Sequence, residues 1–136
     1  MLHNRSVPRA TVIPQLAYPD VAAAAEWLCT AFGFTVRLRI ANHRAQLNVG
    51  DGAIVITEQR HGHPTPGHSL MIRVEGADAY YARATRAGAR TISPPTDYPY
   101  GERQCTVEDL AGHLWTFSQS IADVDPRDWD GEPVEL

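Results

Sequence analysis

The chain has 136 residues, of which 43% are apolar and 21% charged. This length suits one domain, and the globular composition excludes an intrinsically disordered chain. No apolar run approaches the roughly 18 residues of a membrane-spanning helix, and no apolar segment follows the first arginines as in a signal peptide. The two cysteines are too few for a disulfide framework, so we expect a cytoplasmic protein without a membrane partner.

The charge is concentrated at one end. All 12 basic residues are arginine, and the formal net charge is −4. Residues 123–136 contain six acidic residues and one arginine, a net charge of −5, which leaves +1 on the rest of the chain. We interpret residues 123–136 as a solvated acidic tail. The nearly neutral remainder gives no indication of a nucleic-acid partner.

The first half predicts a strand, a helix and a run of strands. Asp20 is typical of a helix N-cap and Gly33 of a helix end, with an Ala-rich segment between them. The alternation of apolar and polar residues that follows is typical of a half-buried strand, and glycines around Asp51 indicate a hairpin. The elements expected here are a strand over 11–18, a helix over 21–32, strands over 34–40, 46–49 and 53–57, and a loop over 60–67.

The same order of elements returns in the second half. It predicts a strand over 69–74, a helix over 77–87, a short strand at 91–92, a loop over 93–100, and strands over 104–107 and 113–118. The helix-ending Gly33 and Gly88 are 55 residues apart, whereas the hairpin residues Gly52 and Gly112 are 60 apart. A repeated unit predicts two modules, because one unit alone cannot cover its sheet. A ferredoxin-like α+β sandwich is the alternative.

Two stretches resemble a known family. One runs from Pro14 through Asp20 to Phe34, and the other contains Tyr100-Gly-Glu-Arg, then Val-Glu-Asp and Gly-His, and ends at Trp115. Both are similar to stretches of the vicinal oxygen chelate superfamily, which includes glyoxalase I, bleomycin-resistance proteins and extradiol dioxygenases. The resemblance implies an α+β fold of paired βαβββ modules, with a curled mixed sheet around a cleft, in a homodimer. We expect a single domain over 1–122, with modules at about 11–60 and 67–121, before the tail.

The resemblance also identifies where metal-using members bind their ion, at one position in the first and fourth strands of each module. The corresponding residues here are Ile13, Ile56, Ser69 and Thr116. None supplies the imidazole or carboxylate that divalent metals favour, so we expect no metal and no other cofactor. A shift of one residue would offer His68 or Glu58 instead, but it would turn polar residues toward the helices.

Strand alternation divides the sheets between a helix-facing side and a side that would line the cleft. The predicted helix-facing residues are Leu16, Val36, Leu38, Leu47, Val55, Leu70, Ile72, Val74, Trp115 and Phe117. The predicted cleft-facing residues are Gln15, Arg37, Arg39, Gln46, Asn48, Ile54, Ile56, Ser69, Met71, Arg73, Arg103, Cys105, Thr116 and Ser118. Guanidinium groups pair with carboxylates and phosphates, so these arginines predict an anionic small-molecule ligand. A solvated outer sheet would show the same pattern.

Arg103 lies in the most family-like motif and is a candidate ligand-binding residue, with a structural pairing to Glu102 or a carbonyl as the alternative. Tyr98 and Tyr100 could stack on a flat ligand from their loop. The full predicted ligand-binding set is Gln15, Arg37, Arg39, Gln46, Asn48, Ser69, Arg73, Tyr98, Tyr100, Arg103 and Thr116.

Other reactive side chains give weaker signals. His61, His63 and His68 belong to a Gly- and Pro-rich segment, which favours a solvated loop over a metal site. His113 follows a hairpin glycine and fits a turn or core position. Cys105 would need a neighbouring base to act as a nucleophile, and the sequence places none.

The function favoured by these patterns is that of a metal-free protein that sequesters a small polar or anionic molecule. A metal-dependent lyase, isomerase or dioxygenase of the same superfamily is one alternative. A metal-independent enzyme is another, with Arg103 stabilising an enolate and Glu58 acting as the base.

Overall fold

The computed structural model describes residues 4–59, 68–129 and 131–133. The chain divides into two compact units, residues 1–65 and 66–136. Its elements follow the order βαβββ twice, which confirms the expected α+β fold. These elements are β1 (Gln15–Tyr18), α1 (Val21–Phe32), β2 (Thr35–Ile40), β3 (Arg44–Val49), β4 (Gly52–Glu58), β5 (Leu70–Arg73), α2 (Ala77–Arg86), β6 (Arg90–Tyr98), β7 (Glu102–Glu108), β8 (Leu114–Ser120) and the 3-10 helix η1 (Pro126–Trp129).

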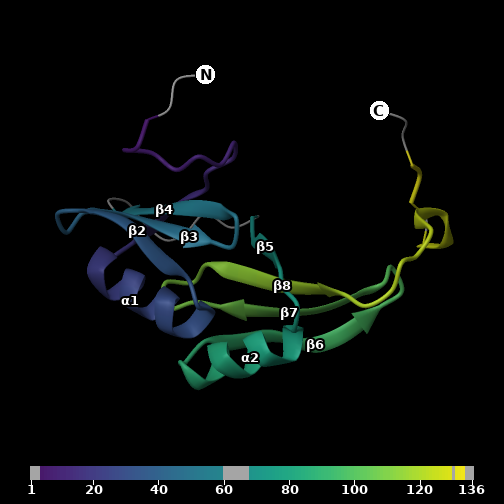
Figure 1. Ribbon diagram of the computed structural model, residues 1–136. Helices are drawn as coiled ribbons and strands as arrows, with labels where there is room; N and C mark the ends of the chain where they lie inside the picture. Colours follow the sequence, from purple (N-terminus) through teal and green to yellow (C-terminus); the bar gives the residue numbers. More distant parts are fainter. Residues whose placement is uncertain (1–3, 60–67, 130, 134–136) are drawn as a thin grey trace. The chain divides into compact units, whose positions relative to one another are not determined.

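The first unit packs α1 on one face of a sheet with strand order β1-β4-β3-β2 (Figure 1). Asp20 caps α1 by accepting a hydrogen bond from the backbone N–H of Ala23 at 3.0 Å. Gly33 ends it with a left-handed φ of 76°, a conformation that glycine adopts without steric cost. The helix buries Leu28 and Phe32 completely or nearly so, and both predicted ends are confirmed.

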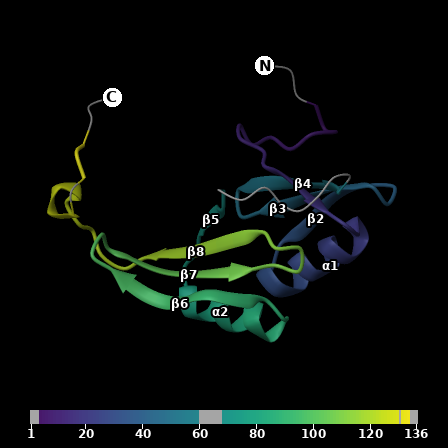
Figure 2. The ribbon, with the colours of Figure 1, turned by 180° about the vertical axis from the view of Figure 1, so that it is seen from behind.

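The second unit repeats this arrangement with α2 and a sheet of order β5-β8-β7-β6. Figure 2, seen from behind, shows each helix along one face of its own sheet. The ring of Tyr80 in α2 packs against the fully buried Phe117 of β8, with centroids 5.2 Å apart. We call the face that carries the helix the helix face and the opposite one the helix-distal face. Among the described residues, no helix is both long and apolar enough to cross a membrane.

Two expectations about the strands are wrong. The loop expected over 93–100 is mostly strand, because β6 extends through its prolines to Tyr98 and pairs with β7 across two register shifts. Val55 lies on the helix-distal face, since it pairs with Gln15 and Gln46, whereas Ile54 and Ile56 lie on the helix face. The four apolar residues 53–56 carry no alternation, so sequence alone did not define their parity.

A bulge in β2 causes a further exchange of faces. The register shifts between Val36 and Leu38, so that Leu38 pairs with Gln46 on the helix-distal face. Arg39 then pairs with Ala45 on the helix face. The predicted sides of Leu38 and Arg39 are therefore both wrong, because one inserted residue reverses the alternation beyond it.

The hairpin between β7 and β8 is organised by one buried carboxylate. Asp109 accepts hydrogen bonds at Oδ1 from the backbone N–H groups of Ala111 and His113, each at 3.0 Å. Its Oδ2 accepts a bond from the indole N–H of Trp115 at 2.9 Å. Trp115 is fully buried, so this carboxylate joins the turn to the core of the second unit.

Replacing Asp109 with alanine should therefore destabilise the second unit. The Asp109→Ala variant loses three acceptor contacts, one of them to a buried indole, and we expect the free energy of unfolding to fall by about 2 kcal/mol or more. Urea unfolding followed by tryptophan fluorescence measures the change. Asp123→Ala, at an exposed position, is the matched control. Equal stability of the two variants would contradict the role given to Asp109.

Candidate functional site

The helix-distal face of the second sheet carries a connected polar array. Gln104 lies at its centre and pairs in register with Ser118. The Gln104 side chain accepts a hydrogen bond from the Tyr100 hydroxyl at 2.9 Å and donates one to Ser118 Oγ at 3.0 Å. Ser118 in turn donates to Glu102 Oε1 at 2.7 Å. Each side chain is oriented by its neighbour, so we define Tyr100, Glu102, Gln104 and Ser118 as the polar array.

Aromatic and apolar side chains border the polar array. Tyr98 stacks on Tyr100 with centroids 5.4 Å apart and rings within 9° of parallel. Trp129 of the acidic tail also packs on Tyr100, with ring centroids 5.2 Å apart, so the tail is not wholly solvated. Met71 is 68% exposed beside the array, with its sulfur 3.7 Å from Gln104 Nε2. Such a border suits a small molecule that has both polar groups and a flat or apolar part.

The array holds Glu102 as a carboxylate. Hydrogen bonds from the hydroxyls of Ser120 and Ser118 lower its pKa, and the positive charge of Arg73 lowers it further. Burial raises the pKa of Tyr100, and the negative charge of Glu102 raises it further. At neutral pH the array therefore offers an ionised acceptor at one end and a neutral phenol at the other.

Several predicted ligand-binding residues lie on helix-distal faces as expected. In the second unit Arg73 and Thr116 do so, with Thr116 joined to Thr106 by a hydroxyl contact of 2.8 Å, and Ser69 is exposed just before β5. In the first unit, the predicted residues Gln15, Asn48, Arg37 and Gln46 form side-chain hydrogen bonds within their own sheet. These are a bond from Arg44 to Gln15 at 3.3 Å, one from Asn48 to Thr35 at 3.1 Å, and a pairing of Arg37 with Gln46.

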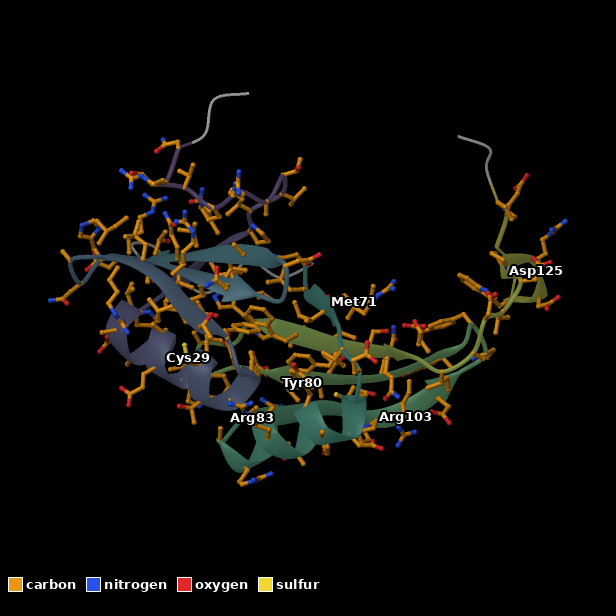
Figure 3. All side chains as sticks on the ribbon, viewed as in Figure 1. Cys29, Met71, Tyr80, Arg83, Arg103 and Asp125 are labelled. Atoms are coloured by element: carbon orange, nitrogen blue, oxygen red, sulfur yellow. The ribbon has the colours of Figure 1, made fainter. Side chains whose placement is uncertain are left out.

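Arg103 does not lie on the face predicted for it. Its guanidinium binds Asp78 of α2 at 3.0 Å and Asp97 of β6 at 2.9 Å, and Figure 3 shows it on the α2 side of the sheet, away from Met71. Glu102, which the structural alternative named as a partner beside a carbonyl, points to the opposite face because adjacent strand residues alternate. Arg103 thus links α2 to β6, and the two carboxylates raise its pKa.

Glu58 is on a helix face as well. It pairs in register with Tyr18, which is fully buried beneath α1. Both residues of the metal-independent enzyme hypothesis, Arg103 and Glu58, therefore belong to helix faces rather than to the helix-distal faces.

Cys105 is also on the helix face, contrary to the predicted parity. It is 1% exposed, pairs with Phe117, and its thiol donates to the carbonyl of Ala77 at the start of α2. Burial raises the pKa of this thiol, so little thiolate forms at neutral pH. These properties are those of a core residue rather than a nucleophile.

Alkylation distinguishes a buried core thiol from a reactive nucleophile at Cys105. We expect iodoacetamide at pH 8 to modify Cys105 only after unfolding in guanidinium chloride, because the thiol is both covered and protonated. Cys29, which is half-buried in α1, serves as the internal comparison and should react first. Peptide mass spectrometry distinguishes the two sites. Labelling of Cys105 in the native protein as fast as in the unfolded chain would exclude this assignment.

The residues at the family metal positions do not form a donor set for a divalent ion. Gln15 pairs with Val55 in the first unit as Met71 pairs with Thr116 in the second, so the fourth-strand position of the first module is Val55 rather than Ile56. The side chains of Val55 and Ile56 are both hydrocarbons, so neither can bind a metal. Over residues 4–59, 68–129 and 131–133, no group of three or more His, Cys, Asp or Glu side chains is placed to hold a metal. His61 and His63 lie outside the described residues.

Glu102 and Gln104 are absent from the predicted cleft-facing residues. The signal was present in β7, because Cys105 and Val107 alternate with polar neighbours and mark the buried side. The motif around Arg103 favoured the opposite parity. Ser118 lies on its predicted side, although the predicted ligand-binding set does not contain it.

Comparisons with known proteins agree with this architecture. The family model described as "Glyoxalase/Bleomycin resistance protein/Dioxygenase superfamily" matches residues 10–117. TioX from Micromonospora sp. ML1 is 32% identical, with a TM-score of 0.69 over 85% of this chain and 100% of TioX. A glyoxalase-related enzyme from Fulvimarina pelagi is 17% identical, with a TM-score of 0.69 over 82% of this chain and 88% of its own.

A lactoylglutathione lyase from Agrobacterium tumefaciens is 16% identical, with a TM-score of 0.64 over 82% of this chain and 94% of its own. At such identities the last two similarities show the fold alone. No curated protein sequence gives a significant match.

Proposed function

Because the chain belongs to the Glyoxalase/Bleomycin resistance protein/Dioxygenase superfamily, we propose that it is a metal-free binding protein of the glyoxalase and bleomycin-resistance type. It sequesters a small polar or anionic molecule on a helix-distal face. The observation that carries this proposal is the polar array of the second sheet, whose side chains are already oriented by hydrogen bonds from Tyr100 to Glu102. Pre-oriented polar groups reduce the entropy lost on binding.

The donor chemistry supports a metal-free protein. The four family metal positions carry Ile13, Val55, Ser69 and Thr116. A hydrocarbon has no lone pair to donate, and neutral hydroxyls alone do not hold zinc, nickel or iron, which favour imidazole, thiolate and carboxylate. The metal-dependent lyase, isomerase or dioxygenase alternative therefore lacks its ligands at these positions.

The side chains of the polar array and its border indicate the chemical class of the ligand. Gln104 and Tyr100 provide amide and hydroxyl groups, and the nearby Arg73 provides positive charge for a carboxylate or phosphate. The stacked Tyr98–Tyr100 pair and the exposed Met71 provide surface for a ring or an alkyl group. A molecule with an anionic group attached to a flat body matches both the polar groups and the aromatic surface.

A binding experiment tests this function. A panel of small carboxylates, phosphates and aromatic antibiotics is screened by thermal shift, and hits are measured by isothermal titration calorimetry. We expect Gln104→Met, which keeps side-chain size but removes the amide, to raise the Kd at least tenfold, because one or two hydrogen bonds are lost. Gln59→Met, in the first unit, is the matched control.

The fate of the ligand distinguishes binding from catalysis. After prolonged incubation with the protein, a sequestered molecule is recovered unchanged by liquid chromatography and mass spectrometry. Conversion of the molecule, or a stoichiometric metal whose removal by EDTA lowers the Tm, would refute the proposal in favour of an enzyme.

We also propose that the protein works as a cytoplasmic homodimer. Each sheet buries one face under its helix, and a second copy of the chain could cover part of the helix-distal faces. Light scattering coupled to size-exclusion chromatography should give twice the 15.0 kDa chain mass. A monomer at micromolar concentration would contradict this.

A further inference from the structure

A second candidate site lies in the first unit, where the N-terminal segment passes over the sheet. Residues 4–14 run along the helix-distal face, on the side opposite α1 (Figures 1 and 2). Between this segment and β2 is a cavity of about 230 Å³ lined by Asn4, Arg5, Arg9 and Arg37. The residues that line it are thus one asparagine and three arginines.

Hydrogen bonds fix one of these arginines in place. Arg37 occupies the bulge of β2 and donates to the side-chain carbonyl of Gln46 and to the backbone carbonyl of Arg5, the latter at 2.9 Å. Gln46 is 4% exposed, and its Nε2 donates to the carbonyl of Ser6 at 2.8 Å. A guanidinium has five N–H donors in a rigid plane, so these two bonds orient it and leave further donors for a ligand.

The N-terminal segment that lines the cavity contains no acidic residue. The first acidic residue of the chain is Asp20, so residues 1–19 carry Arg5 and Arg9 without a carboxylate, although the whole chain has a net charge of −4. The oxygen of the Asn4 side chain accepts a hydrogen bond from the N–H of Ser6 at 3.0 Å. Its Nδ2 carries two further N–H donors. The lining presents N–H groups that match an anion with several oxygens.

We propose that this cavity binds a phosphate group, either as inorganic phosphate or as the phosphate of a small monoester. A phosphate near neutral pH carries a charge of about −1.5 to −2 and offers oxygens in several directions, which suits three guanidinium groups better than a monovalent, planar carboxylate. The volume is below the roughly 300–1,000 Å³ of pockets that enclose a drug-sized molecule. The site is separate from the polar array and does not depend on the function proposed for it.

Binding would also stabilise the N-terminal segment on the sheet. Arg5 and Arg9 belong to the segment and Arg37 to β2, so one anion would bridge the two parts. Trypsin cleaves after arginine, and an ordered peptide is a poorer substrate than a mobile one. Phosphate should therefore slow cleavage after Arg5 and Arg9.

The test measures binding of inorganic phosphate and of glycerol phosphate by isothermal titration calorimetry, at an ionic strength held constant with sodium chloride. We expect saturable binding to the intact protein and a Kd at least tenfold higher in the double variant Arg5→Gln/Arg9→Gln. That variant keeps the backbone carbonyl of residue 5, and with it the bond from Arg37. Arg86→Gln, at an exposed position of α2, removes the same type of charge and should bind like the parent.

The calorimetry and the trypsin cleavage each have an outcome that supports the phosphate site. Tighter binding of the ester or of the free ion identifies the source of the phosphate, and a twofold or greater slowing of trypsin cleavage at the two arginines supports the bridge. Equal affinity of the double variant and the parent, or heat signals that chloride reproduces, would overturn the proposal. Neither result depends on the Gln104→Met experiment, so the two proposals fail separately.

Discussion

Packing of a helix against one face of each sheet is the constraint from which the rest of the structure follows. Leu28 and Phe32 of α1 and Tyr80 of α2 provide apolar surface, and the strand residues beneath them are buried. Because strand side chains alternate, burying one face leaves every second residue on the other. Polar residues gather there since the core has no place for them. The helix-distal faces are therefore a consequence of packing before they are candidates for binding.

The polar residues of the two helix-distal faces form different kinds of contact. In the second unit, side chains bind one another, and Gln104 joins a phenol to a hydroxyl and a carboxylate. In the first unit, Arg37 and Gln46 bind backbone carbonyls of the chain's own N-terminal segment. The same fold thus gives a side-chain array on one sheet and an arginine-lined cavity on the other. A shared supersecondary unit does not impose shared chemistry.

The sequence predicted the order of elements and the helix ends well, because Asp20 and Gly33 act locally. The sequence was a poorer guide to the face of the sheet on which a strand residue lies, because strand register determines that face. The bulge at Arg37 reversed the sides of two neighbours, and the apolar run around Val55 had no alternation to read. The predicted face of Arg103 is wrong, because Arg103 lies in β7 on the same side as the buried Cys105 and Val107.

The N-terminal contacts were beyond prediction for a different reason. The bonds that Arg37 and Gln46 make to the carbonyls of residues 5 and 6 join positions more than 30 residues apart. Backbone carbonyls exist at every residue, so no sequence pattern marks which of them will accept such a bond.

The alternation in β7 has an evolutionary consequence. Cys105 and Val107 stabilise the second unit from one face, while Glu102 and Gln104 form the array on the other. Residues that maintain the fold and residues of the proposed binding array are thus interleaved along the chain. A substitution on one face leaves the side chains of the other face in place, so the two sets of residues can change in separate steps. This separation gives the scaffold a capacity to acquire new ligands while its core is retained.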